Sequence, residues 1–316
     1  MNRMHRLRSV IGPLLSIAIL LLAIGAIRSL IIDVTLDQVV SALLDISPFL
    51  VCVAVFFTAV VCVILAFYDV LAFVYLGMKV PIRNILLGSF VSNVIGFNTG
   101  LALFTGGSVR WRMYGKDGVT AKQVVKISIF GTVNFILLLL LMSGVALQLN
   151  AGNVLQDAGI PMAATRLLGA LLVAIVLSYL LTSVLWHGRL VPIHRWHVRV
   201  PDVPIAFAQV ILTGLEVTCI AAVLYALLPP TSLSFLSFLG LFAIAQFTGY
   251  MSQLPGGLLG FDATIAFLLR GTLPSGSVFA SLIAFRVIYS LLPLLVALVI
   301  FFAHEARKAH RKIWQR

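Results

Sequence analysis

The chain has 316 residues, of which 61% are hydrophobic and 10% are charged, and its mean hydropathy is +1.12. A soluble domain carries charge on about a quarter of its residues, so this composition indicates an integral membrane protein and leaves no room for a soluble catalytic domain. The net charge of +12 does not indicate nucleic-acid binding, because the lysines and arginines lie in short clusters between apolar runs, where they orient the chain during insertion.

Six continuous apolar runs are long enough to cross a bilayer, since a transmembrane helix needs roughly 20 apolar residues. They lie at residues 11–32, 47–68, 124–149, 167–186, 204–228 and 277–303. The first run has no small-residue cleavage site, so we expect a retained span rather than a signal peptide. Two further apolar stretches, 84–107 and 232–270, are interrupted by Gly, Asn, Gln and Pro.

Loop charge predicts how these pieces thread, because cytoplasmic loops carry an excess of Lys and Arg. Residues 77–83 contain Lys79 and Arg83, and residues 108–123 contain four basic residues, so both loops belong on the cytoplasmic side. The stretch 84–107 between them therefore has not crossed the membrane. We expect it to form a re-entrant hairpin that enters from the cytoplasm.

The second interrupted stretch is expected to form a hairpin of the opposite orientation. The last span runs into a basic C-terminus in the cytoplasm, so residues 229 and 276 both lie outside and 232–270 enters from the outer face. The basic N-terminus is likewise cytoplasmic. The expected fold is an all-α polytopic membrane protein with six full transmembrane helices plus two oppositely oriented re-entrant helical hairpins.

The two hairpins suggest an inverted repeat. The expected pseudo-repeats cover about 47–149 and 204–303 of a single membrane domain, 1–316, and Asp69 lies 147 residues before Glu216. Paired interruptions of this kind point to a transporter's substrate site, because irregular backbone is tolerated at membrane depth only where it lines a cavity or is buried in protein. The expected hairpin tips are Asn98, Gly106, Gly107, Pro255, Gly256 and Gly257.

Acidic side chains are rare in this chain, with ten in all, so the three that lie within or beside apolar segments are informative. They are Asp69, Glu216 and Asp262. An ionisable side chain at the centre of a transmembrane helix costs about 2.5–3.5 kcal/mol on insertion scales, which favours a partner or a function. A solvated position near a segment end is the alternative for Asp69 and Asp262.

The candidate counter-charges are Arg110, Arg112, Arg270 and Arg286. Arg110 and Arg112 follow a Gly-Gly pair and alternate with Trp111 and Tyr114, an arrangement in which backbone N–H groups and guanidinium groups converge on a phosphate. A lipid headgroup is the natural phosphate at that depth. The alternative is that both arginines only anchor the loop on the cytoplasmic side. We expect Arg286, inside the last span, to pair with an embedded carboxylate.

No pattern in the sequence is typical of a catalytic, metal or cofactor site. His187, His194 and His197 cluster in one loop without acidic or Cys neighbours that complete a metal set, and a basic loop that faces lipid headgroups is the preferred interpretation. The three cysteines lie inside apolar runs and indicate no disulfide framework. No nucleotide-binding loop occurs, so we expect neither an enzyme nor a cofactor.

Four motifs occur in order along the chain. They are Tyr68-Asp69, Gly106-Gly107-Ser-Val-Arg110-Trp111-Arg112-Met113-Tyr114, Leu254-Pro255-Gly256-Gly257-Leu-Leu-Gly260-Phe261-Asp262, and Arg286-x-x-Tyr289-x-x-x-Pro293. Together they resemble the lysylphosphatidylglycerol synthase transmembrane-region family, over about residues 10–305. That family includes the flippase half of the multiple peptide resistance factor MprF and stand-alone YbhN-like inner-membrane proteins.

The resemblance implies a bacterial plasma-membrane protein that moves anionic or aminoacylated phosphatidylglycerol-type lipid between leaflets. It implies a role in translocation for Asp69, Arg110 or Arg112, Glu216 and Asp262. The sequence departs from the family pattern in the second hairpin. The family reads Pro-Gly-Gly-x-Gly-x-Phe, whereas here Leu stands at position 259 and glycine at position 260. We expect no domain that attaches the amino acid to the lipid, so an aminoacylated substrate requires a separate lipid-modifying enzyme as a partner.

The expected function is therefore phospholipid translocation. Arg110 and Arg112 receive the phosphate at the cytoplasmic rim, while the embedded acids balance charge, contact a cationic headgroup or couple protons, and Arg286 belongs to the same set. Two alternatives stay open: a proton-coupled transporter of a small anion, which needs a sealed cavity, and a non-transporting scaffold for a lipid-modifying enzyme. The oligomeric state also stays open, with a homo-oligomer as one option.

Overall fold

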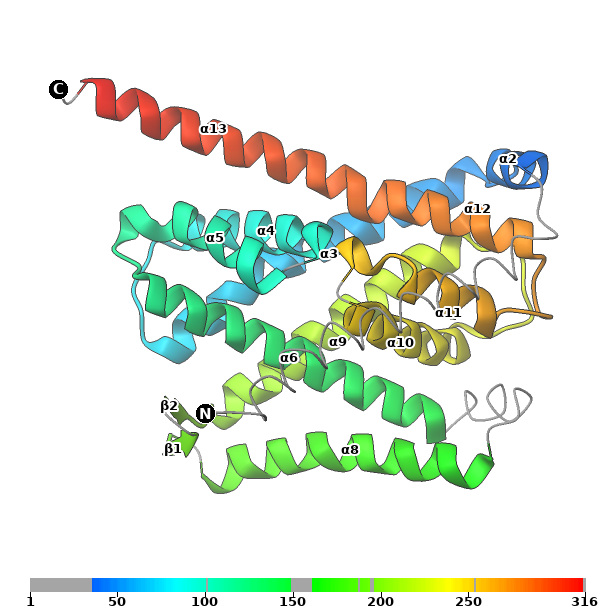
Figure 1. The fold of residues 1–316 in the computed structure, drawn as a ribbon, viewed down its shortest axis with the longest axis horizontal. Helices are drawn as coiled ribbons and strands as arrows, with labels where there is room; N and C mark the ends of the chain where they lie inside the picture. Colours follow the sequence, from blue (N-terminus) through cyan, green and yellow to red (C-terminus); the bar gives the residue numbers. More distant parts are fainter. Residues whose placement is uncertain are drawn as a thin grey trace, which may run out of the picture.

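The structure, a computed structural model, describes residues 36–100, 102–148, 161–186, 188–193, 196–252 and 254–314. The expected first span, 11–32, lies outside the described residues. Within the described ranges the chain is almost entirely helical (Figure 1), which confirms the all-α class.

Helices of very different lengths follow one another along the chain. In chain order they are α2 (Leu36–Leu44), α3 (Pro48–Leu76), α4 (Ile82–Thr99), α5 (Ala102–Tyr114), α6 (Ala121–Gln148), α8 (Met162–Leu185), α9 (Val203–Leu227), α10 (Phe235–Ser252), α11 (Gly260–Leu268), α12 (Ser275–Phe285) and α13 (Leu292–Trp314). Two short 3-10 turns, η1 (Gly115–Asp117) and η2 (Pro255–Gly257), follow α5 and precede α11. A π-helical segment, η3 (Arg286–Leu291), joins α12 to α13.

Six helices in the described part of the chain are long and apolar enough to cross a membrane. They are α3, α6, α8, α9, α10 and the continuous helix from Ser275 to Arg307. All but α10 match expected spans, and α10 lies within the second interrupted stretch. It has 18 residues, which makes it about 27 Å long, close to the roughly 30 Å of a hydrocarbon core. The protein is therefore a multi-pass membrane protein.

The helix α3 is longer than the sequence predicted. The apolar run ended at residue 68, just before Asp69, whereas α3 continues to Leu76 and closes on Gly77 at φ +65°. The helix continues because Asp69 is buried and paired with Arg110, so its charge does not have to reach water.

Each interrupted stretch forms two helices joined by a break. In the first pair, α4 is followed by Gly100 (φ +77°), and α5 packs against α4. In the second pair, η2 separates α10 from α11, and α11 packs against α10. Of the expected tip residues of the first pair, Asn98 lies two residues before the break, whereas Gly106 and Gly107 lie inside α5, so a break at the Gly-Gly pair is wrong. Gly106 instead permits close helix packing, since an added Cβ would lie 3.1 Å from the Ser92 carbonyl oxygen on α4.

The tip of the second pair has an unusual backbone. Gly256, Gly257 and Leu259 all have positive φ, at +60°, +67° and +65°. Leu259 is the central residue of a γ-turn, in which the Gly260 N–H donates to the Leu258 carbonyl oxygen at 2.8 Å. The family pattern places glycine at 259, a residue that adopts this conformation freely. Leu259 therefore has a backbone conformation that residues other than glycine rarely adopt.

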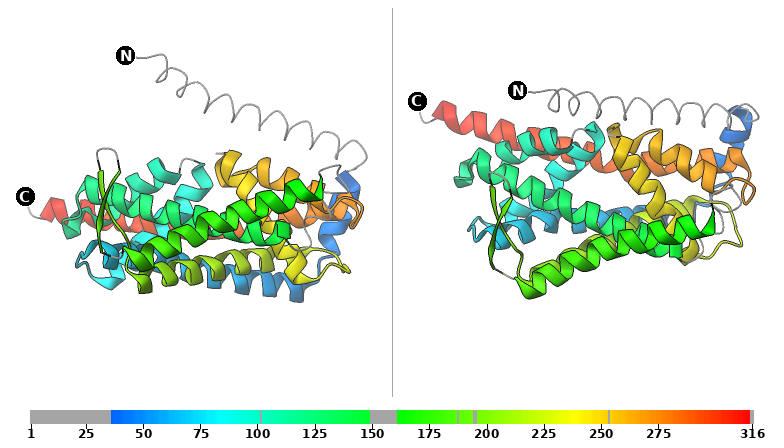
Figure 2. Two further views of the ribbon diagram at one scale, coloured as in Figure 1. Left: turned by 90° about the horizontal axis from the view of Figure 1, so that it is seen from below. Right: turned by 60° about the horizontal axis from the view of Figure 1, so that its bottom comes forward.

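The long helices lie side by side, and the two broken pairs lie toward opposite ends of them (Figure 1). α4 and α5 lie toward the end that carries the C-terminus, and α10 and α11 lie toward the end where α12 begins. The turned views in Figure 2 keep this arrangement. α3 packs against α9, and α6 against α8 and α10, so helices from both halves of the chain meet in the middle of the molecule.

The loop between α8 and α9 contains an antiparallel β-hairpin that the sequence analysis did not predict. Its strands are β1 (Leu190–Ile193) and β2 (Trp196–Arg199). Three β-branched residues in these eight positions favour extended backbone. Of the histidine cluster expected in this loop, His187 and His194 lie outside the described residues.

Candidate functional site

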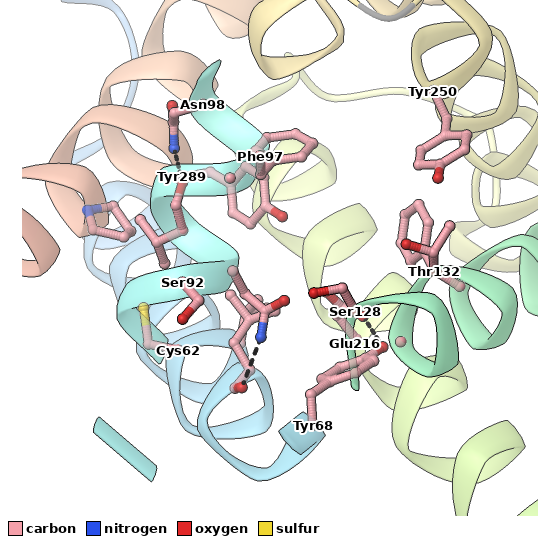
Figure 3. A pocket seen from close by; sticks show the side chains of 18 of the residues that line it. Cys62, Tyr68, Ser92, Phe97, Asn98, Ser128, Thr132, Glu216, Tyr250 and Tyr289 are labelled. Carbon is pink, nitrogen blue, oxygen red and sulfur yellow. Dashed lines mark hydrogen bonds between the residues drawn. The ribbon is translucent and has the colours of Figure 1, made fainter. Parts of the chain in front are cut away.

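A cavity of about 130 Å³ lies where α3, α4, α5, α6, α9, α10 and η3 meet. Its lining is mostly apolar but includes polar side chains from six helices. They include Tyr68, Asn93, Arg110, Ser128, Glu216 and Gln246. Figure 3 shows Tyr68 and Glu216 at one end of this central cavity and Asn98 and Tyr250 toward the other.

A second cavity, of about 220 Å³, adjoins the central cavity and reaches both helix breaks, at Gly100 and Gly257. The residues that line both cavities are Phe97, Leu103, Thr132, Phe135, Gln246 and Tyr250. Phe104 also lines the second cavity and is 71% exposed on the outside of the molecule. The second cavity therefore lies between the central cavity and the apolar outer surface of the broken pairs.

Asp69 and Arg110 form a buried ion pair at the wall of the central cavity. The Nε and Nη2 of Arg110 each donate to a carboxylate oxygen of Asp69 at 2.9 Å. Asn93 accepts from Nη2 at 2.8 Å, and the Tyr114 hydroxyl donates to Asp69 at 2.7 Å. Asp69 and Arg110 are 2% and 5% exposed, so Asp69 is not the solvated segment end that was the alternative.

The guanidinium of Arg110 keeps donors for a ligand. Its Nη1 has a long contact of 3.4 Å to the Ser128 hydroxyl, and both residues line the central cavity. The Nη1 group carries two N–H donors. A phosphate oxygen in the cavity would therefore meet an oriented donor whose position is fixed from behind by Asp69.

Glu216 is an embedded acid for which the described residues provide no cationic partner. It is 4% exposed, lines the central cavity and accepts a hydrogen bond from the Tyr68 hydroxyl. Among the described residues, no Lys, Arg or His makes an ion pair with it. A buried carboxylate normally has a counter-charge, so a cation in the cavity is its natural complement.

Asp262 and Arg286 form a second ion pair, at the tip of the second broken pair. The Nη2 of Arg286 donates to both carboxylate oxygens of Asp262, at 3.0 and 2.9 Å, so the pairing expected for Arg286 is present. Arg286 also donates to the Gly256 carbonyl oxygen, and its guanidinium lies 5.6 Å from the centre of the Phe261 ring. One side chain from η3 therefore holds the tip in place.

Two of the expected counter-charges lie away from both cavities. Arg112 has a side chain that is 56% exposed and pairs with Glu305 of α13 at 3.4 Å. Arg270 is exposed in the turn after α11. Asn98, an expected tip residue, lies in the last turn of α4, where its amide donates to the Val94 carbonyl oxygen at 2.9 Å.

The sequence analysis missed the uncharged members of the site. Asn93, Ser128 and Gln246 line the central cavity, and Tyr114 supports Asp69 from behind. The signal that could have found the two amides is their position within apolar helices, where a polar side chain needs a partner.

No family model matches this chain. It is 33% identical over 238 residues to protein slr0712 of Synechocystis sp., which covers 73% of this chain and 72% of that protein. It is 28% identical over 243 residues to inner membrane protein YbhN of Escherichia coli, which covers 76% of this chain and 75% of YbhN. It is 27% identical over 247 residues to the phosphatidylglycerol lysyltransferase of Staphylococcus aureus, which covers 75% of this chain and 27% of that enzyme. The chain belongs to the YbhN-like family of multi-pass membrane proteins, to which the membrane region of MprF is related.

Proposed function

We propose that this protein translocates a phospholipid of the phosphatidylglycerol type, anionic or aminoacylated, between the two leaflets of the bacterial inner membrane. One observation carries the proposal. A single cavity between apolar helices contains a buried guanidinium and a buried carboxylate that has no cationic partner among the described residues. Such a cavity complements a headgroup that carries a phosphate, an ammonium or both.

Arg110 binds the phosphate of the headgroup in this proposal. Arg110 lines the cavity and its Nη1 has only a long contact to Ser128, and charge-assisted hydrogen bonds from a guanidinium to a phosphate are among the stronger polar contacts in proteins. Asp69 neutralises most of the Arg110 charge before the lipid arrives, so the guanidinium does not bind the phosphate too tightly for release. Arg112 meets the phosphate earlier, at the cytoplasmic rim, where its side chain is exposed.

Glu216 binds the ammonium of an aminoacylated headgroup, and the aromatic rings of Tyr68 and Tyr289 line the cavity beside it. The name of the staphylococcal relative states that it transfers lysyl to phosphatidylglycerol, which is a lipid of this chemistry once modified. A separate lipid-modifying enzyme supplies the aminoacylated lipid in this proposal. An unmodified anionic lipid uses the Arg110 end alone.

The acyl chains stay in the bilayer while the headgroup passes between the two broken helix pairs. The second cavity leads from the central cavity toward Phe104 and Leu103, which are exposed to the surroundings. The broken pairs lie toward opposite ends of the long helices (Figure 1), which supports two re-entrant hairpins of opposite orientation and an inverted repeat. The two hairpins would then serve the two leaflets.

A non-transporting scaffold, the alternative function, needs no cavity, and its embedded charges would all lie in mutually satisfied pairs. Asp69 with Arg110, and Asp262 with Arg286, are such pairs. Glu216 and the central cavity do not fit that description, because the described residues offer the carboxylate no counter-charge. This difference favours transport.

The proposal is tested by leaflet-resolved transport in proteoliposomes, with labelled phosphatidylglycerol, its lysyl and alanyl esters, and glucosyl diacylglycerol as the neutral lipid, whose headgroup has neither a phosphate nor an ammonium. We expect the purified protein to move at least one of the phosphatidylglycerol lipids faster than glucosyl diacylglycerol. Glu216→Gln should slow the aminoacylated lipids more than phosphatidylglycerol, and Arg112→Ala and Asp262→Ala should each slow all of them. If no lipid moves faster than in empty liposomes, translocation is excluded.

A further inference from the structure

Gln246 of α10 is a buried amide that faces the cavities. It lines both the central and the second cavity, and its residue is 8% exposed. No other described residue makes a hydrogen bond to its side chain. Its amide oxygen and nitrogen are not sealed inside the protein, so they border open space, and that space is the two cavities.

Other buried amides of the chain have partners within the protein. Gln209, which is 2% exposed on α9, accepts a hydrogen bond from the Tyr179 hydroxyl at 2.8 Å. Asn134, which is 4% exposed on α6, donates to the Thr213 hydroxyl at 2.6 Å. Leaving a buried amide without a partner is unfavourable. The open position of Gln246 is therefore an exception that requires a reason.

The environment of Gln246 recurs in the other half of the chain. Residues 93–97 of α4 and residues 246–250 of α10 both have an amide first, a glycine fourth and an aromatic fifth, in helices of 18 residues each. The amide and the aromatic of both segments line the central cavity. Asn93 accepts from Arg110, a polar group that the protein itself supplies. Gln246, at the equivalent position, has no such partner among the described residues, so its amide is available to a polar group of a ligand.

We propose that Gln246 binds a headgroup hydroxyl of the translocated lipid at the wall that the two cavities share. This inference rests on the proposed translocation of phospholipid. The charged groups of the headgroup have other partners, since Arg110 and Glu216 line the central cavity and not the second. A primary amide both donates and accepts hydrogen bonds, which matches a hydroxyl, and the glycerol headgroup of phosphatidylglycerol carries two of them.

The test compares phosphatidylglycerol with phosphatidylpropanol, which has the same charge and no headgroup hydroxyl. The full-length wild type should move phosphatidylglycerol about five- to tenfold faster at subsaturating lipid, the discrimination that one hydrogen bond supplies. Gln246→Leu should move both lipids at the phosphatidylpropanol rate, through a higher KM for phosphatidylglycerol. Its lipid-free melting temperature should be equal to or above that of the wild type, because the change removes an unpartnered amide.

Gln209→Leu is the matched control. It makes the same change at a bonded amide that lines neither cavity, so it should lower the melting temperature and keep the preference for phosphatidylglycerol. The inference is overturned if Gln246→Leu keeps that preference, if the wild type has none, or if Gln246→Leu melts lower and slows both lipids equally.

A second readout separates this inference from the function on which it rests. If the wild type moves neither lipid, translocation is excluded, and lipid binding then decides the role of Gln246. If phosphatidylglycerol raises the melting temperature of the wild type in detergent, but not that of Gln246→Leu, Gln246 binds the lipid even though the protein does not transport it. If the lipid raises the melting temperatures of the two proteins equally, Gln246 does not bind it, and the inference is excluded together with translocation.

Discussion

Asp69 and Arg110 are held away from water, whereas Arg112 is exposed and Glu305 is half-buried. The side chains of the first pair are 3% and 6% exposed, and those of the second are 28% and 56% exposed for Glu305 and Arg112. Removing one partner of a buried pair leaves a charge in an apolar environment. An exposed charge that loses its partner is solvated at once, so the same kind of contact has very different effects at the two positions.

Asp69→Asn should therefore lower the free energy of unfolding by about 3–5 kcal/mol, because it leaves the Arg110 guanidinium buried without a counter-charge. Arg112→Ala should lower it by less than about 1 kcal/mol. Reversible unfolding in detergent measures both. The double variant Asp69→Asn with Arg110→Gln should recover part of the loss, and equal effects of Asp69→Asn and Arg112→Ala would contradict this account.

Gly88 shapes the same site from behind. A Cβ added at Gly88 on α4 would overlap the ring of Tyr114, which is fully buried and donates to Asp69. Gly88→Ala should lower the free energy of unfolding by about 1–3 kcal/mol, since the ring must move and its hydrogen bond is disturbed. Gly131→Ala on α6, where no atom lies within 4 Å of the added Cβ, is the control and should be neutral or slightly stabilising. Melting curves of the two variants that coincide would refute this role of Gly88.

At the level of elements, the position of the first helix break is open to a direct test. Gly100 has φ +77°, which an alanine adopts only at a cost of about 1–2 kcal/mol. Gly107 lies inside α5, and its added Cβ would meet only the Ser128 hydroxyl, at an ordinary 3.8 Å. Gly100→Ala should thus destabilise the protein in thermal melts and Gly107→Ala should not. If Gly107→Ala destabilises the protein and Gly100→Ala does not, the break lies at the Gly106-Gly107 pair.

The second helix break carries strain at Leu259. Its φ of +65° is unfavourable for any residue with a Cβ, so Leu259→Gly should raise the free energy of unfolding by up to about 1 kcal/mol. Gly260→Ala is the contrasting change, because its Cβ would lie 2.9 Å from the Thr248 carbonyl oxygen and should destabilise the tip. Chemical unfolding of the two variants measures both effects. A loss of stability in Leu259→Gly would mean that packing of the leucine side chain outweighs the backbone strain.

Across the whole molecule, a chain of aromatic contacts connects the two broken pairs. Phe97 of α4 lies 6.1 Å from Tyr289 of η3, measured between ring centres, and Tyr289 stacks on Phe285 at 5.0 Å. Phe285 in turn stacks on Phe261 of α11 at 5.6 Å. Because η3 is π-helical, a form often found at functional sites, a change in its pitch would move both broken pairs together.

Hydropathy predicted the long helices well, because a membrane core imposes the same length and polarity on every span. It placed the end of α3 too early, since a single sequence does not show that Asp69 is neutralised by Arg110, 41 residues away. It misplaced the first break because glycine serves turns and close helix contacts alike, and Gly106 serves the second purpose.

The site was predictable where it is charged and not where it is neutral. Asp69, Glu216 and Asp262 were evident because ionisable residues are rare in apolar segments. Which of these acids is paired depends on tertiary contacts, as Asp69 and Asp262 are and Glu216 is not among the described residues. Tertiary contacts also separate Gln246, open to the cavities, from Gln209, which is bonded to Tyr179. Composition and spacing do not distinguish these two glutamines.

The orientation of the whole molecule in the membrane is the remaining prediction. Lys116 follows α5, and Ser275 begins the long helix that ends at the basic C-terminus, so the two lie toward opposite ends of the molecule (Figure 1). In a background without native cysteines, Ser275→Cys should react with an impermeant maleimide from outside the cell, and Lys116→Cys only after permeabilisation. The reason is that the basic residues around Lys116 and in the C-terminal turns of α13 resist translocation.

If both labels behave in this way, the second broken pair begins and ends on the outer side, because α6, α8 and α9 each cross the membrane once between the two labels. If both cysteines react from the same side, the broken pairs do not face opposite leaflets. Lipid would then have to pass through the central cavity by one entrance, and the two-hairpin route would fail even if transport were observed.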